Sequence, residues 1–330
     1  MPCRLCGDPI VYNINSHLAP RAITQSTFGK VDHEEIYTID LQAASFDVFH
    51  GRAHPQAKPD VIKPLPNTAK GIFCKKCENG FGQLETICQP LLVNAFVGLA
   101  DGTLPVFKIE KGLVAFTLPI HINIFNLFFL SVIWRECVSS EIEVGSLILT
   151  QGDFDSLQNS LVTEIHKTKK QIEESPNFVN YPLVTVFTAI NRGETEGFVN
   201  PSALVTNPEV FFIGDYSCLF FKKAPHTKHL FKLLGVPFAL QQISGDKAAH
   251  TTTRVILIEE RFYGDIAQLS IKHSVNLFFE IHAKRIALHR GIGILTAHYI
   301  LRQTAMQFYF QNNMQDYTKC LLDASAFLCQ

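Results

Sequence analysis

The chain has 330 residues, of which 47% are hydrophobic and 18% are charged, and its formal net charge at pH 7 is −1. This composition excludes an intrinsically disordered chain, and the balanced charge excludes a globally basic surface, so nucleic-acid binding would have to use local patches. The length exceeds that of one typical domain, so we expect a small N-terminal domain and a larger body.

The first motif in the chain is a pair of cysteines two residues apart, Cys3 and Cys6, and the same spacing recurs at Cys74 and Cys77. This spacing lets both thiolates of a pair reach one ion, and two pairs supply the four soft ligands of a closed tetrahedral zinc site. The two pairs use four of the nine cysteines in the chain. We therefore predict a structural Zn²⁺ bound by all four.

The chain between the cysteine pairs contains the segment Ser16-His17-Leu18-Ala19-Pro20, a histidine with a proline three residues later. Residues 25–70 are rich in His, Asp and Pro, which predicts an irregular insertion with one short strand at Glu35–Ile39. The second cysteine pair leads into a predicted helix. Glu78 and Glu85 lie two turns apart on it, so they share one face.

This order of motifs resembles the HNH, or ββα-metal, endonuclease family over about residues 1–90. The segment from Cys77 to Glu85 also looks like the C-N-x-x-F-G-x-x-(D/E) ending of one subgroup of that family. The resemblance implies an α+β fold that begins with a zinc-stabilised ββα-metal finger. It also implies a metal-dependent endonuclease in which His17 is the general base that activates water and Glu78 binds a catalytic Mg²⁺ or Mn²⁺, with Glu85 as a further candidate ligand.

The chemistry of these side chains suits that activity, but two positions depart from the family pattern. Neutral imidazole can accept a proton near pH 7, and carboxylates bind hard divalent ions. Ser16 stands where many members have Asp or Glu, and Glu78 stands where members usually have His or Asn. The pair Asp32-His33 keeps His33 open as a second candidate base, although no proline follows it at the same spacing.

The departures leave a second function open, a catalytically degenerate zinc module that binds nucleic acid or a protein partner. For either function we expect nucleic acid as the partner, DNA ahead of RNA, with Lys75, Lys76 and Arg21 as candidate contacts. A protein partner or a homo-oligomer would use the body. The five remaining cysteines are scattered and odd in number, which is typical of a reducing compartment, so we expect a cytoplasmic protein. Because the motif begins at residue 3, we expect no signal peptide.

The body is predicted to begin after residue 98, so the domains are residues 1–98 and 99–330. Its predicted elements form a mixed α+β body with C-terminal helices, in this order: a hairpin at 105–116, a buried helix at about 123–138, a helix at 153–174, strands at 183–190, 210–213, 217–221 and 254–258, and helices at 264–289 and 296–328. The apolar run from Phe116 to Trp134 is interrupted by proline, histidine and asparagine, so we predict no membrane span.

Two further features of the body carry less information about function. The segment from Phe128 to Arg135 reads F-F-L-S-x-x-W-R and resembles poorly described bacterial proteins that pair such a segment with an N-terminal finger. That resemblance implies no activity for the body. His282, Arg285 and His289 recur at helical spacing, with Lys284 and Arg290 nearby. We interpret them as a solvated helix face, and the alternative is a basic patch that contacts phosphates.

Overall fold

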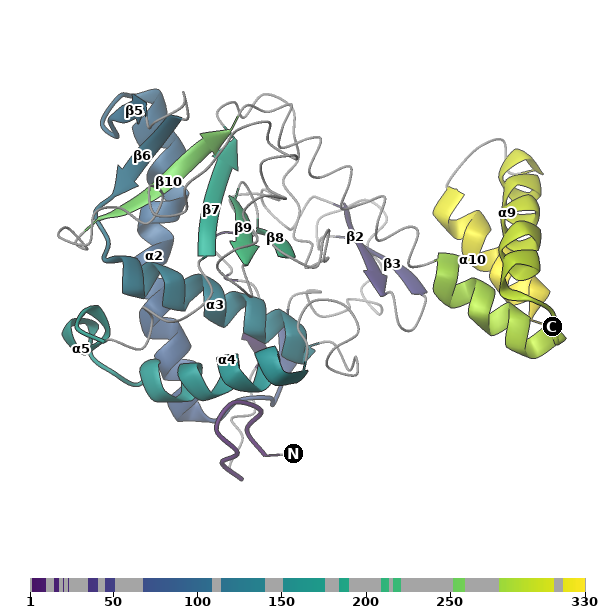
Figure 1. The fold of residues 1–330 in the computed structure, drawn as a ribbon, viewed down its shortest axis with the longest axis horizontal. Helices are drawn as coiled ribbons and strands as arrows, with labels where there is room; N and C mark the ends of the chain where they lie inside the picture. Colours follow the sequence, from purple (N-terminus) through teal and green to yellow (C-terminus); the bar gives the residue numbers. More distant parts are fainter. Residues whose placement is uncertain are drawn as a thin grey trace. The chain divides into compact units, whose positions relative to one another are not determined.

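The computed structural model describes residues 2–9, 15–17, 20, 23, 35–40, 45–50, 68–108, 114–139, 151–175, 184–189, 209–213, 216–220, 252–258, 279–311 and 317–329 (Figure 1). These residues mix helices and strands, as the α+β prediction requires. The chain forms two compact units. Unit 1 combines Met1–Gly29 with Asn67–Gln268, and unit 2 combines Lys30–Pro66 with Leu269–Gln330.

The described residues of unit 1 form two sheets. A two-stranded sheet pairs β1 (Asn15–His17) with β4 (Thr68–Lys70) antiparallel, with Ser16 opposite Ala69. A six-stranded sheet has the strand order β5-β6-β10-β7-β9-β8, and its only parallel pair among these strands is β10 with β7. Its strands are β5 (Val106–Lys108), β6 (Val114–Leu118), β7 (Val184–Ala189), β8 (Glu209–Ile213), β9 (Tyr216–Phe220) and β10 (Thr253–Ile258).

The described part of unit 1 also contains the helices α2 (Lys75–Ala100), α3 (Ile122–Ser139), α4 (Gln151–Glu164) and α5 (Lys169–Glu173). Helix α3 contacts α2, α4, α5 and β7, and it lies between the six-stranded sheet and α4 in Figure 1. Because it is enclosed on all sides, α3 is apolar around nearly its whole circumference. The predicted buried helix is thereby confirmed. No helix within the described ranges is long and apolar enough to cross a membrane.

The helix predicted over 153–174 is two helices in the structure. Helix α4 ends at Glu164, and Thr168 begins α5 with a capping box, in which its side chain accepts from the Gln171 backbone N–H while the Gln171 side chain accepts from the Thr168 N–H. The amide nitrogen of Asn123 on α3 then donates to three carbonyls at the end of α5. These bonds add a donor to carbonyl groups at a helix end, where intrahelical partners are few, and they hold the end of α5 against α3.

Unit 2 combines a hairpin with helices. Strands β2 (Glu35–Asp40) and β3 (Ser45–His50) pair antiparallel, and β3 contacts α10 (Tyr317–Leu328). Residues 279–290 are helical and α9 (Ile294–Gln311) packs on α10. Most of the predicted insertion therefore belongs to the unit that contains the C-terminal helices. Residues 264–278 of the predicted helix lie outside the described residues.

One histidine of unit 2 differs from its predicted environment. His282 is 2% exposed, and its Nδ1 shares a hydrogen bond with the Ser325 hydroxyl of α10. Arg285 and His289 are exposed, as a solvated helix face requires. His282 lies on the side of its helix that packs on α10, so only part of the predicted face is solvated.

The core of unit 1 is continuous from the first cysteine pair to the six-stranded sheet. Cys3, Cys77, Trp134 and Val255 belong to one cluster of buried side chains. The expected domain boundary at residue 98 does not separate the two units, which meet in the chain after Gly29, Pro66 and Gln268. Residues on both sides of position 98 belong to unit 1, because α2 packs along α3 and the two helices share this core. The cysteine-bearing segments are therefore part of a larger folded unit.

Candidate metal centre and its surroundings

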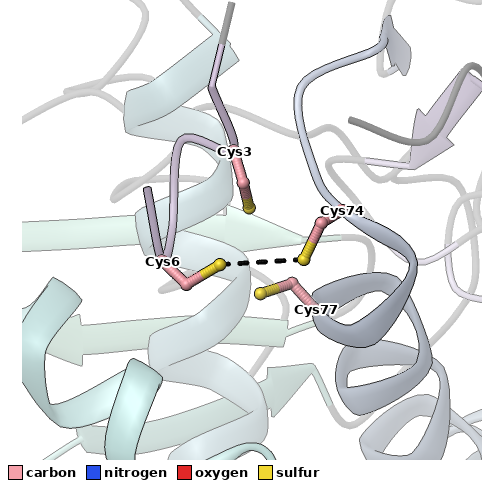
Figure 2. A group of neighbouring side chains, drawn as sticks. All are labelled: Cys3, Cys6, Cys74 and Cys77. Carbon is pink, nitrogen blue, oxygen red and sulfur yellow. Dashed lines mark hydrogen bonds between the residues drawn. The ribbon is translucent and has the colours of Figure 1, made fainter. Parts of the chain in front are cut away.

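The four predicted zinc ligands converge, as Figure 2 shows: the sulfur atoms of Cys3, Cys6, Cys74 and Cys77 all lie within 4.8 Å of one another. The sulfurs of Cys6 and Cys74 are 3.7 Å apart. A disulfide would bring them to about 2.05 Å, whereas a tetrahedron with metal–sulfur bonds of about 2.3 Å has edges of about 3.8 Å. All nine cysteines of the chain lie within the described residues, and none of them is in a disulfide. The arrangement therefore fits a four-coordinate metal ion.

Two tight turns give the cysteine pairs this geometry. Gly7, directly after Cys6, has a φ of 77°, and Gly71, before the second pair, has a φ of 65°. Glycine adopts this left-handed conformation without steric cost. The Gly7 N–H donates to the Cys3 carbonyl at 2.9 Å, and the Arg4 N–H donates to the Ile72 carbonyl at 2.9 Å. The last bond joins the two cysteine-bearing segments through their backbones.

The electrostatics of the cluster also favour a cation. Burial, followed by the charge of Cys3, raises the pKa of the Cys77 thiol well above its usual range. Burial also acts to raise the pKa of Cys3, but hydrogen bonds from backbone groups outweigh it and lower that pKa. Thiolates this close repel one another, and a bound divalent cation removes the repulsion. Four soft sulfur ligands suit zinc, and they would leave it no open position for a substrate.

The segment with the candidate base lies next to the start of α2. Ser16 of β1 is 1% exposed, and its hydroxyl donates a hydrogen bond to Oε1 of Glu78, in the first turn of α2. Burial raises the pKa of the Glu78 carboxyl, while the Ser16 hydrogen bond and the charge of Arg135 oppose that rise. His17 follows Ser16 in β1. The placement of the His17 side chain lies outside the described part of the structure.

The second candidate carboxylate, Glu85, has a partner that sequence reasoning did not anticipate. Nη1 of Arg135 on α3 lies 2.6 Å from Oε1 of Glu85, and the two side chains are 2% and 20% exposed. The Arg135 guanidinium also lies 4.8 Å from the centre of the Phe81 ring. Glu85 therefore already faces a buried cation. Its role as a ligand of a catalytic metal stays a prediction.

Helix α4 and the turn after it contribute two more side chains near the cysteines. The Gln158 side-chain amide donates to the carbonyls of Arg4 and Leu5, at 2.9 and 2.8 Å, between the first two cysteines. His166 has Nε2 3.9 Å from the Cys77 sulfur. Burial, followed by the charge of Lys76, lowers the pKa of His166 and so favours its neutral form. No local pattern marks these residues, because they are far from the cysteines in the chain.

The predicted nucleic-acid contacts are described only in part. Lys75 and Lys76 are exposed in the first turn of α2, directly after Cys74. Arg21 lies outside the described residues, as does the second candidate base, His33. These two exposed lysines thus lie in the same turn that supplies Cys77.

No protein-family model matches the chain, and no curated protein or solved structure matches it significantly. The established facts are a mixed α+β fold and a four-cysteine cluster near the N-terminus that could hold a metal such as zinc. The residues around that cluster are therefore the basis for assigning a function.

Proposed function

We propose that the protein is a metal-dependent endonuclease that hydrolyses phosphodiester bonds, in DNA ahead of RNA. In this proposal His17 is the general base and Glu78 is a ligand of a catalytic Mg²⁺ or Mn²⁺. The observation that carries the proposal is the hydrogen bond between Ser16 and Glu78, since it ties the strand that contains His17 to the turn that follows Cys77. The pairing of β1 with β4 holds the same strand from its other side.

Each group has a distinct task in this reaction. The neutral imidazole of His17 takes a proton from a water molecule, which then attacks the phosphorus atom. Glu78 offers carboxylate oxygen, the ligand type that hard divalent ions prefer. Such an ion, when bound, polarises the phosphate and stabilises the leaving oxygen. The four cysteines would serve a different purpose, because a metal bound by four thiolates would have no open position for a substrate and would only stabilise the structure.

A zinc-stabilised module that binds nucleic acid or a protein without cleaving anything is the second candidate function. The salt bridge between Arg135 and Glu85 favours it, since one carboxylate of the presumed ion site already has a cationic partner at 2.6 Å. The Ser16 hydroxyl likewise gives Glu78 a hydrogen-bond donor without any ion. Under this function the polar groups around α2 would stabilise the fold, and Lys75 and Lys76 would contact the partner.

A cleavage assay separates the two functions. Purified protein is incubated with plasmid, single-stranded DNA or RNA, in Mg²⁺, in Mn²⁺ or in EDTA. We expect cleavage that needs the divalent ion and falls at least about 100-fold in His17→Ala, the usual loss on removing a general base. Glu78→Gln should lose activity in the same way. Both variants should keep their zinc, because neither residue belongs to the cysteine cluster.

The matched control is His289→Ala, which removes an exposed histidine of unit 2 and should cleave like the wild type. If His17→Ala cleaves at the wild-type rate, the base is not His17, and the same assay on His33→Ala tests the other candidate. If the wild type binds DNA but cleaves no substrate with either ion, the second function replaces the first.

A further inference from the structure

The helix α4 and the turn after it contact both cysteine pairs from outside the cluster. Gln158, near the middle of α4, hydrogen-bonds the backbone between Cys3 and Cys6, and His166, in the turn, approaches Cys77 at 3.9 Å. These contacts come from one continuous stretch of chain, but they reach segments 153 and 89 positions away in the sequence. The cysteine-bearing segments are thus contacted by a part of the molecule that contributes no cysteine to the cluster.

The approach of His166 to Cys77 is built into the packing of α2. Gly80 lies one turn after Cys77, and a Cβ atom on it would come within 2.8 Å of the Ile165 carbonyl oxygen. Only a residue without a side chain lets the turn lie this close to α2. The bonds from Asn123 to the end of α5, together with the packing of α4 and α5 on α3, hold the turn from the other side.

When the cluster holds an ion, the chemistry of the two groups decides which of them donates the hydrogen bond. A metal-bound cysteine is a thiolate and therefore accepts hydrogen bonds. The imidazole of His166 can donate from Nε2, the nitrogen that faces the sulfur. Such a donor withdraws negative charge from the sulfur and holds it in the orientation that the metal needs. Groups that hydrogen-bond metal ligands typically change metal affinity by about 10- to 100-fold.

We propose that His166 is a positioning residue of the metal centre, which donates an Nε2–H hydrogen bond to the metal-bound Cys77 thiolate and slows the loss of the ion. This role depends on metal binding by the four cysteines and is independent of whether the protein cleaves nucleic acid. If His166 has this role, retention of the ion depends on the α4–α5 turn. A residue far from the cysteines in the sequence then contributes directly to metal affinity.

The test compares His166→Gln, which keeps a side-chain N–H donor, with His166→Leu, which fills a similar volume without one. Zinc affinity of the full chain is measured by competition with a chromogenic chelator. The cobalt-loaded protein supplies a second readout, since its sulfur-to-metal charge-transfer absorption reports on the thiolates. We expect His166→Leu to bind zinc about 10- to 100-fold more weakly and to shift that absorption. His166→Gln should stay within a few-fold of the wild type.

Two outcomes would overturn the proposal. One is wild-type zinc affinity and absorption in His166→Leu. The other is an equal loss in both variants, because that would assign the effect to packing and not to the donor. His289→Ala is the control for general effects of replacing a histidine and should match the wild type. Thermal unfolding of each metal-loaded variant confirms that the compared proteins are folded.

Discussion

The Ser16 hydroxyl donates a hydrogen bond to the Glu78 carboxylate and joins β1 to the first turn of α2 across 62 positions of sequence. Ser16 is 1% exposed, so water competes little for this bond. A carboxylate at position 16, as the HNH pattern has it, would instead face the Glu78 carboxylate directly. Two carboxylates in direct contact repel each other unless a cation lies between them.

The variant Ser16→Asp uses that repulsion to detect an ion site. Without divalent ions we expect its free energy of unfolding in urea to fall by about 1.5–3 kcal/mol or more, since a hydrogen bond to a charged group is also lost. Mn²⁺ should restore most of the loss, and cleavage at low metal concentration should rise. Ser16→Ala is the control, because it removes the hydroxyl without adding a charge. If Mn²⁺ changes neither the free energy of unfolding nor the cleavage rate of Ser16→Asp, no ion binds between positions 16 and 78.

Removing the metal should weaken the whole of unit 1. The core is continuous from the cysteines to α3 and the six-stranded sheet, so we expect the effect of metal loss to extend beyond the first 98 residues. Structural zinc in small fingers contributes about 10–16 kcal/mol of binding free energy that is also folding free energy. We expect chelation or Cys74→Ser to increase hydrogen exchange in α3 and β10 as well as in α2.

Cys329→Ser is the control for this experiment, since Cys329 is a free thiol in unit 2 and takes no part in the cluster. It should keep one zinc per chain by elemental analysis and show wild-type exchange. Faster exchange confined to residues 2–9 and 68–100 after chelation would instead support a finger that unfolds separately from the body.

Gly80→Ala should be destabilising, although alanine is the better helix former. The new Cβ would lie 2.8 Å from the Ile165 carbonyl oxygen and would force α2 and the α4–α5 turn apart. Overpacking of this kind costs about 1–3 kcal/mol. Gly82→Ala is the matched control two residues later, where nothing lies within 4 Å of the added atom. It should gain about 0.5–1 kcal/mol from helix propensity. Urea unfolding of both variants checks that the free energy of unfolding falls in Gly80→Ala and rises in Gly82→Ala.

Lys75 and Lys76 should contribute to nucleic-acid binding through phosphate contacts. Replacing both with alanine should weaken DNA binding and lower the slope of log K against log salt by about 1–2, since each phosphate contact contributes about 0.9. Lys169→Ala with Lys170→Ala is the matched control, because these exposed lysines lie 3.9 and 3.8 Å from Glu173 and Glu174. Equal effects of the two double variants on the salt dependence would exclude a specific role for α2.

The local pattern of the chain was enough to predict much of this protein. Two residues between the cysteines of a pair let both thiolates reach one ion, so the convergence of the four cysteines could be predicted before any fold was known. The apolar run before Arg135 predicted a buried helix, and the structure places it at Ile122–Ser139. The break between α4 and α5 was missed, although Thr168 and Gln171 show the capping-box spacing that marks a helix start.

The tertiary structure alone decided what surrounds those four sulfur atoms. Arg135, Gln158 and His166 are ordinary helix or turn residues in the sequence, and packing brings them to Glu85, to the first cysteine pair and to Cys77. It also placed residues 30–66 in the unit of the C-terminal helices. The spacing of two cysteines in a pair involves only a few residues and can be read directly from the sequence. A contact across about a hundred residues depends on how whole helices pack, and no short pattern encodes that.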